Sequence, residues 1–211
     1  MQNKKEALLE LRQKLEKMAD DGLLPLASSA QQTVPGEGNP DAEIMFIGEA
    51  AGRNEAIQRR PFVGIAGKML QRELEKQGLK REDVYISNVV KARPPENRDP
   101  LPEEIAAYKT LLDEEIDILQ PSVIVTLGRF SMAKFIPDAK ISHIHGRLHR
   151  VTIGAKQYYV LPFFHPAAAL RRGSVMESFI ADFEKLPKIV QWVKEQKSTQ
   201  KMKDEIIDAL W

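Results

Sequence analysis

Four glycines, a carboxylate and an aromatic ring stand close together in the segment FIGEAAGRNEAIQRRPFVGIAG, residues 46–67. Glu49 follows an apolar run typical of a strand, and Pro61 restricts the backbone just before Phe62. Glycines let backbone amides approach a ligand closely, and ligands of open α/β sheets bind where strands end. The segment therefore predicts a pocket for a small planar ligand on which Phe62 stacks. The alternative is a tight strand-to-helix turn without a chemical role, and the spacing matches neither a P-loop nor GxGxxG.

A second candidate is Asn88, near the end of the apolar run in VYISNVVKARPPENRDP, residues 84–100. Asn is unfavourable inside a strand unless its amide is used. That amide offers a donor and an acceptor, which suits the edge of a pyrimidine, where a carbonyl adjoins an imide N–H. The alternative is an Asn that caps the following loop. Three cations follow among prolines: Lys91, Arg93 and Arg98.

A third candidate is His165 in FFHPAAALRR, residues 163–172, at the end of another apolar run. A histidine in this place can donate a hydrogen bond to a developing oxyanion, although a structural histidine fits the local pattern as well. Pro166 opens a short helical turn, and Arg171 and Arg172 follow closely. The functional interpretation of His165 is stronger because the Phe62 and Asn88 segments occur in the same chain.

The remaining histidines, His143, His145 and His149, invite a metal-site interpretation. In an extended segment, odd-numbered residues share one face, which would group these three with Arg147. No carboxylate or cysteine nearby completes a defined metal site. We therefore expect a basic ribbon here, and no metal.

Strand and helix patterns alternate along the chain and predict an α/β fold with a mainly parallel sheet and helices on both faces. The expected strands cover 43–48, 84–90, 122–127 and 158–164. The expected helices cover 1–20, 66–77, 102–119, 129–135 and 174–197, with a charged helix or tail over 197–211. Right-handed crossovers would gather the strand ends at one edge, so Gly48, Asn88, Gly128 and His165 should lie near one another.

The bulk composition limits the possible functions. A chain of 211 residues suits a single domain over residues 1–211, and a net charge of +1 gives no overall signal for a polyanion partner. The sequence has no cysteine, which excludes disulfides, thiolate clusters and a cysteine nucleophile. We find no apolar stretch of bilayer length and no signal-peptide core, and we expect a cytoplasmic protein that does not contact membranes.

The three segments together resemble the uracil-DNA glycosylase superfamily, specifically its family 4 of bacteria and archaea. The similarity runs from about residue 33 to 188, and it carries GEAAGRNEAIQRRPFVGIAGKML, NVVKARPPENRDP and HPAAALR in the family's order and spacing. The resemblance implies a three-layer α/β/α fold with a central four-stranded sheet. It also implies a monomeric, monofunctional enzyme of base excision repair, which releases uracil from single- or double-stranded DNA and leaves an abasic site.

The resemblance also implies roles for individual residues. Phe62 would stack on a flipped uracil, Asn88 would read its edge, and His165 would face uracil O2. Gly48 and Ala50 would belong to the substrate-binding site. Ala50 stands where other families keep an Asp that orients water, which leaves Glu49 and the loop backbone as candidates for placing it. The cations implied to grip the DNA backbone are Lys91, Arg93, Arg98, Arg147, Arg171 and Arg172.

The chain also departs from the family pattern. Family 4 enzymes usually hold a [4Fe–4S] cluster through four cysteines, and the motifs align these ligands with Asp21, Leu24, Ala92 and Tyr108. We therefore expect a relative without the cluster and with no other cofactor. Three further departures are Ala51 for Pro, Ala56 for Asp and Arg59 for Gly. They leave two alternatives open: a weak or inactive relative that only binds DNA or a damaged base, or a glycosylase for hypoxanthine or xanthine.

Overall fold

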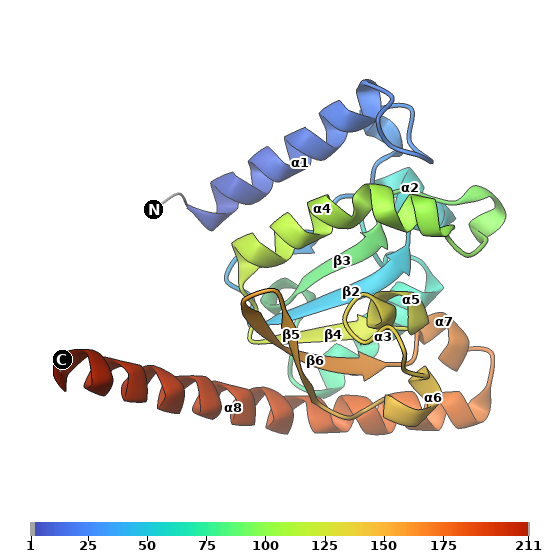
Figure 1. The fold of residues 1–211 in the computed structure, drawn as a ribbon. Helices are drawn as coiled ribbons and strands as arrows, with labels where there is room; N and C mark the ends of the chain where they lie inside the picture. The colour runs from blue at the N-terminus through green and yellow to red at the C-terminus, as the bar shows by residue number, and fades with distance from the viewer. Residues whose placement is uncertain (1–2, 211) are drawn as a thin grey trace.

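The computed structural model describes the backbone of residues 3–210, and the side chains of residues 3–200 and Met202. Seventeen elements follow one another along this part of the chain (Figure 1). The strands are β1 (Glu37–Gly38), β2 (Ile44–Ala50), β3 (Tyr85–Val90), β4 (Val123–Leu127), β5 (His149–Ile153) and β6 (Lys156–Phe163). The α-helices are α1 (Lys4–Asp20), α2 (Arg53–Gln58), α3 (Ile65–Lys76), α4 (Pro102–Leu119), α5 (Arg129–Ala133), α6 (Ile141–Ile144), α7 (Pro166–Ala169) and α8 (Gly173–Leu210). Three short 3-10 turns complete the set: η1 (Ala30–Gln32), η2 (Arg81–Asp83) and η3 (Pro95–Asn97).

The strands form one sheet in the order β1-β3-β2-β4-β6-β5. The four middle strands are mutually parallel, as the alternating pattern predicted. The predicted number of strands was too low, because β1 and β5 add an antiparallel strand at each edge. β1 has only two residues, and β5 forms a hairpin with β6 through Gly154, whose φ is +60°. Neither edge strand carries a long apolar run that the sequence would reveal.

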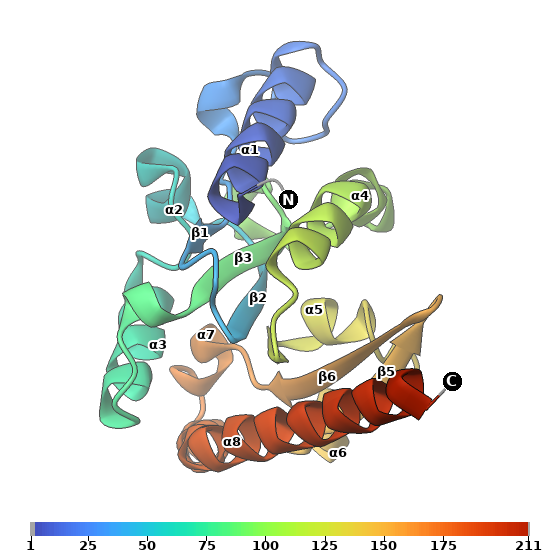
Figure 2. The ribbon, with the colours of Figure 1, turned by 90° about the vertical axis from the view of Figure 1, so that its left-hand side faces the viewer.

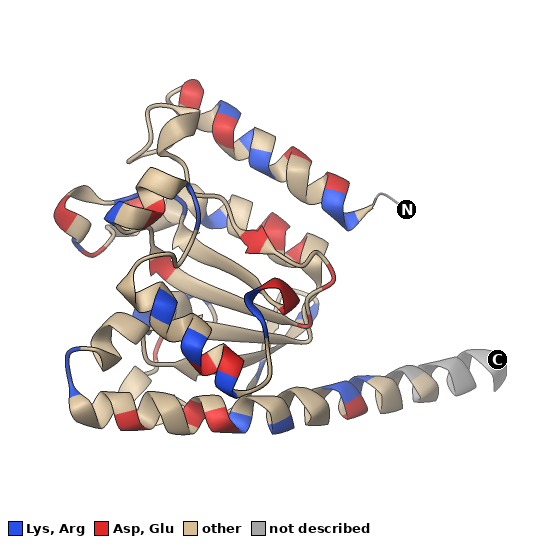
Figure 3. Ribbon diagram, turned by 180° about the vertical axis from the view of Figure 1, so that it is seen from behind, with Lys and Arg blue, Asp and Glu red and all other residues tan. Residues whose placement is uncertain are grey.

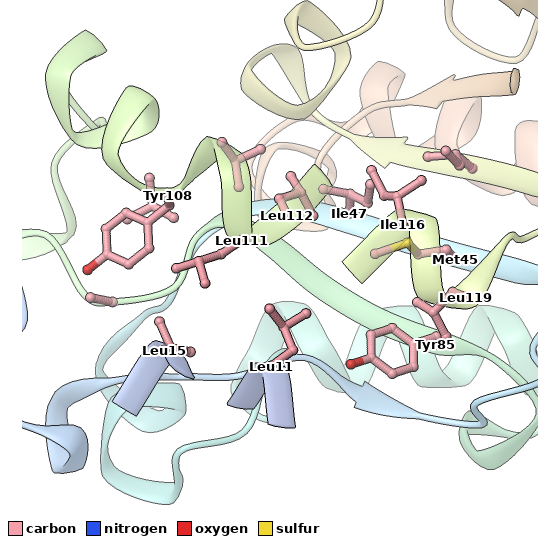
Figure 4. Close-up of a cluster of buried hydrophobic side chains, with 14 of the residues drawn as sticks. Leu11, Leu15, Met45, Ile47, Tyr85, Tyr108, Leu111, Leu112, Ile116 and Leu119 are labelled. Atoms are coloured by element: carbon pink, nitrogen blue, oxygen red, sulfur yellow. The ribbon is translucent and has the colours of Figure 1, made fainter. Parts of the chain in front are cut away.

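Successive residues of the middle strands point to opposite faces and build two separate cores. Met45 and Ile47 pack with α1 and α4, as Figure 4 shows, whereas Ile44 and Phe46 pack with α3 and α8 on the other face. Figures 1 and 2 show α1 and α4 on one side of the sheet and α8 along the other. The predicted three-layer α/β/α arrangement is confirmed.

The C-terminal helix does not end at residue 197, where the sequence predicted a boundary between a closing helix and a charged helix or tail. α8 runs from Gly173 to Leu210 without a break and contains Pro187. Its first half is anchored by buried aromatic residues, among them Phe179 and Phe183. Residue 211, part of the predicted tail, lies outside the described residues. Of the helices in the described part of the chain, none combines the length and apolar character that crossing a membrane requires.

The predicted basic ribbon of histidines is wrong. His143 lies in the short helix α6, His145 follows that helix, and only His149 belongs to a strand. His145 Nδ1 lies 2.6 Å from Oδ2 of Asp182, a carboxylate of α8 that is 1% exposed. This distant acidic partner turns His145 inward, away from any shared face. Within the described residues, no group of three or more His, Asp or Glu side chains could hold a metal ion.

Lys91 also differs from its implied role in gripping DNA. Its side chain is 2% exposed, and Nζ lies 2.7 Å from Oε2 of Glu115 in α4 and 2.6 Å from Oγ of Ser87. Ser87 and the Tyr85 hydroxyl also donate to Glu115. The ammonium group therefore fastens α4 to β3 and is not available to a phosphate.

Because Lys91 neutralises a buried carboxylate, we expect Lys91→Met to lower the free energy of unfolding by about 3–5 kcal/mol. Urea unfolding monitored by circular dichroism would measure this loss. The control is Lys91→Met combined with Glu115→Gln, which removes both charges, keeps an acceptor for Ser87 and Tyr85, and should recover most of the stability. Equal loss in the single and double variants would contradict a charge-pairing role for Lys91.

Candidate active site

An open cavity of about 540 Å³ lies at the carboxyl ends of the four parallel strands. Glu49, Asn88, Gly128 and His165 all line it, each from a position within two residues of the end of one strand. In the register of β2 and β3, Gly48 is paired with Asn88. The prediction that these strand ends meet is confirmed.

Phe62 lines this cavity, and its side chain is 6% exposed. Gly48 makes its position possible, because a Cβ there would come within 2.5 Å of Phe62 Cε2 and would also strike the Asn88 side chain. The centroids of the Phe62 and His165 rings are 5.7 Å apart. The ring predicted to stack on a ligand therefore shares the cavity with both polar candidates.

The backbone of Phe62 has φ +52°, a conformation that costs a residue with a side chain about 1–3 kcal/mol. Glu55 helps to hold the loop in this shape. Its Oε1 accepts hydrogen bonds from the backbone N–H of Val63 at 3.0 Å and of Gly64 at 2.7 Å. These amides precede α3, so Glu55 also supplies a carboxylate at the start of that helix. Sequence reasoning missed Glu55, although its position in α2, shortly before the Phe62 loop, was a usable signal.

Asn88 is 2% exposed, and its Oδ1 has no hydrogen-bond partner among the described residues. Leaving a buried acceptor unpaired costs about 1–3 kcal/mol. The alternative of a loop-capping Asn predicts a bond to the following backbone, and none is formed at this oxygen. The amide is thus placed at the wall of the cavity with an acceptor that a ligand could satisfy.

His165 has a defined tautomer. Its Nδ1 accepts a hydrogen bond from the backbone N–H of Ala167 at 3.1 Å, so the neutral ring carries its proton on Nε2. Burial, with a smaller contribution from the positive charge of Arg171, lowers the pKa of His165 to about 4. At physiological pH the ring is therefore an uncharged donor beside the cavity.

Glu49 is half-buried at the end of β2 and has a raised pKa of about 7. Burial is the main cause, the negative charge of Asp99 adds to it, and Arg129 opposes it. Asp99 and Arg129 form an ion pair with each other, and both line the cavity. Glu49 therefore exchanges its proton near neutral pH, as a group that places or activates water would need to.

The cations implied to contact DNA are distributed unevenly. Arg98 and Arg171 line the cavity, whereas Arg147 and Arg172 are exposed outside its lining. Arg98 is partly committed, since Nη2 lies 2.6 Å from Oε1 of Glu104. Arg93 Nε donates to Asn97 Oδ1 at 2.8 Å. Figure 3 shows acidic and basic segments interspersed along α1. The cavity lining is mixed as well, since Glu49, Glu55 and Asp99 line it together with Arg98, Arg129 and Arg171.

Of the three departures from the family motif, only Ala51 lines the cavity. Arg59 ends α2 with φ +53°, a conformation that glycine favours. Its side chain points toward α1, where it pairs with Glu16 and donates to the Thr33 carbonyl at 3.2 Å. Ala56 also lies outside the lining of the cavity. Arg59 therefore serves the attachment of α1, remote from the candidate chemistry.

The four positions aligned with cluster ligands do not fit an iron–sulfur cluster. Leu24, Ala92 and Tyr108 are all at most 5% exposed and belong to one apolar core. The Tyr108 hydroxyl donates to the Pro25 carbonyl at 2.6 Å, and Asp21 is exposed and paired with Lys17. None of these side chains is a thiolate, the ligand that such clusters require.

Known proteins match most of this chain. The model of the uracil DNA glycosylase superfamily matches residues 35–194. A type-4 uracil-DNA glycosylase of Archaeoglobus fulgidus is 46% identical over 159 residues, which cover 72% of this chain and 79% of that protein. The type-4 enzyme of Thermotoga maritima is 42% identical over 79% of this chain and 88% of its own length, and a type-5 enzyme of Thermus thermophilus is 31% identical over 61% and 63%. The residues of its three motifs meet at one cavity. The chain belongs to the uracil DNA glycosylase superfamily and is similar to its type-4 enzymes.

Proposed function

We propose that this protein is a monofunctional uracil-DNA glycosylase, which hydrolyses the N-glycosidic bond of a flipped deoxyuridine and leaves an abasic site. One observation carries the proposal: a single open cavity joins a stacking ring, a buried amide with a free acceptor and a neutral histidine donor. Flipping is needed because the bond is out of reach inside a stacked duplex. Uracil in single- or double-stranded DNA would be the substrate.

Asn88 would give the site its preference for uracil. Its Oδ1 would accept from uracil N3–H while Nδ2 donates to O4, and Phe62 would stack on the ring. Cytosine presents an acceptor at N3 and a donor at position 4, the reverse pattern. In the amide orientation of this structure, cytosine would leave the buried Oδ1 of Asn88 unpaired, so the energetic cost already present in the free protein would be kept.

His165 and Glu49 would divide the chemistry between them. As the C1′–N1 bond breaks, its electron pair stays on uracil, and the Nε2–H of His165 would stabilise negative charge at O2. One such donor is typically worth about 3–4 kcal/mol of barrier. Water adds its oxygen to C1′ and gives up a proton, which the Glu49 carboxylate could accept. The same carboxylate would stabilise positive charge on the sugar.

DNA would be held by local arginines, since the net charge of the chain is only +1. Arg98 and Arg171 at the cavity, with Arg93 and Arg172 close to them in the sequence and Arg147 exposed elsewhere, would neutralise phosphates. Such contacts give binding that weakens steeply with salt. We propose that the enzyme works as a monomer and without an iron–sulfur cluster, since apolar packing occupies three of the four aligned ligand positions.

The proposal predicts that the protein cleaves uracil from a defined oligonucleotide, seen as strand scission after alkali. The matched control carries thymine at the same position. No release with enzyme in excess over DNA would overturn the proposal, and tight binding without release would favour an inactive relative. Faster release of hypoxanthine or xanthine than of uracil would move the substrate assignment to those bases.

We expect Asn88→Asp to lower kcat/KM for uracil about 10- to 100-fold, because a carboxylate cannot donate to O4 and a bidentate base contact is worth about 1–3 kcal/mol. The ratio of uracil to cytosine release should fall with it. Single-turnover assays on both substrates would measure the effect. An unchanged ratio would count against Asn88 as the group that reads the base.

The raised pKa of Glu49 predicts a dependence of rate on pH. If the carboxylate is the active form, the single-turnover rate should rise about tenfold per unit below pH 7 and level off above it. The lowered pKa of His165 predicts no decline from that ring above about pH 5. Glu49→Gln should be slow at every pH and should lack the rise. A rise that persists in Glu49→Gln would assign it to another group.

A further inference from the structure

Arg81 makes an unusual set of contacts with the loop that carries Phe62. From η2, just before β3, its Nη1 donates to the Phe62 carbonyl at 3.0 Å and its Nη2 donates to the Pro61 carbonyl. The opposite side of the guanidinium is held by Glu37 of β1, with Nη2 2.6 Å and Nε 3.1 Å from Oε1. The Arg81 side chain is 19% exposed. A planar fork fixed at both ends in this way has little freedom to move.

The two sides of Phe62 are held by opposite charges. Arg81 donates to the carbonyls of residues 61 and 62, while Glu55 accepts from the N–H groups of residues 63 and 64. Gly67 closes the third side, since a Cβ there would strike the Phe62 carbonyl. Each group meets a backbone dipole of the sign that it prefers, which stabilises the left-handed φ of Phe62. Without the Arg81 fork, the two carbonyls would be free to turn.

We propose that Arg81 is a positioning residue for Phe62 and so sets how closely the ring lies against the flipped base; this rests on the proposed function. Arg81 is absent from the lining of the cavity and acts only through the loop backbone. The stacking ring must match the base within fractions of an ångström, because a misplacement of about 1 Å can cost about 100-fold in rate. The loop conformation that provides this match is one that Phe62 alone would avoid.

Arg60 offers a matched control. It pairs with the same carboxylate of Glu37, at 2.7 Å from Nε, but no hydrogen bond joins its side chain to the Phe62 loop among the described contacts. Removing Arg60 thus takes away one cationic partner of Glu37, while the carbonyls of residues 61 and 62 keep their hydrogen bonds from Arg81. Any effect specific to Arg81 must come from those carbonyls.

The test compares Arg81→Met, Arg81→Lys and Arg60→Met with the wild-type protein. We expect single-turnover uracil release to slow about 10- to 100-fold in both Arg81 variants, since lysine keeps the charge but loses the fork. Binding to DNA that carries an abasic-site analogue, which has no base to stack on, should stay within about twofold. Arg60→Met should keep both properties. In Arg81→Ala, added methylguanidinium should restore part of the rate.

Three results would overturn the proposal: a rate in Arg81→Lys within about twofold of wild type, an equal loss in Arg60→Met, or DNA binding that weakens in parallel with the rate. If Arg81→Met fails to fold, Arg81→Lys decides. A second readout does not depend on activity. The His165 ring protons sense the Phe62 ring 5.7 Å away, so their NMR shifts should move in the Arg81 variants and not in Arg60→Met. If the wild type releases no uracil, the proposed function fails, while these shifts still test whether Arg81 positions Phe62.

Discussion

The close approach of two strand ends governs this structure. Gly48 and Asn88 are register partners on adjacent parallel strands, and the Phe62 ring and the Asn88 amide both occupy the space that a Cβ of residue 48 would fill. The parallel sheet is what brings these groups together, since crossover connections return every strand to the same edge. Both cores support this edge of the sheet. In one, α4 packs against β3. In the other, α3, which begins just after the Phe62 loop, packs against the opposite face. A side chain at residue 48 would separate the ring from the amide and remove the cavity's two recognition groups together.

Three features of the cavity cost stability in the free protein. Asn88 has an unpaired acceptor, Phe62 adopts a left-handed backbone, and burial raises the pKa of Glu49. Each of these features lowers stability in the free protein and becomes useful when a base and a sugar cation enter. A donor on the base would satisfy the Asn88 oxygen, and positive charge on the sugar would favour the Glu49 carboxylate. Strain of this kind persists only where neighbouring structure holds it, which is the part that Glu55 and Arg81 play.

Much of this could be predicted from the sequence, for local reasons. Apolar runs mark the four parallel strands, and polar residues at their ends mark the cavity. What could not be predicted depends on partners distant in the chain. Lys91 looked like a free cation beside a proline-rich loop, but Glu115, 24 residues later, takes it into the core. His145 looked like part of an exposed ribbon, but Asp182, 37 residues later, turns it inward. Local sequence patterns indicate which face of an element a residue occupies. They do not indicate which distant charged residue it will contact in the core.

The departures from the family motif can be understood in the same terms. Arg59 joins α2 to Glu16 and Thr33, and Tyr108 joins α4 to Pro25 in the segment that follows α1. Both contacts attach the N-terminal segment to the body of the protein, and Leu24 and Ala92 fill the core between them. Three of the positions aligned with cluster ligands, Leu24, Ala92 and Tyr108, therefore share one task with Arg59, which is to hold α1 and the segment after it in place. That task lies on the α1 side of the sheet, whereas base recognition lies at the strand ends. A change in how α1 is held can thus leave the geometry of Phe62, Asn88 and His165 intact, and the lack of cysteine in this chain is no argument against its chemistry.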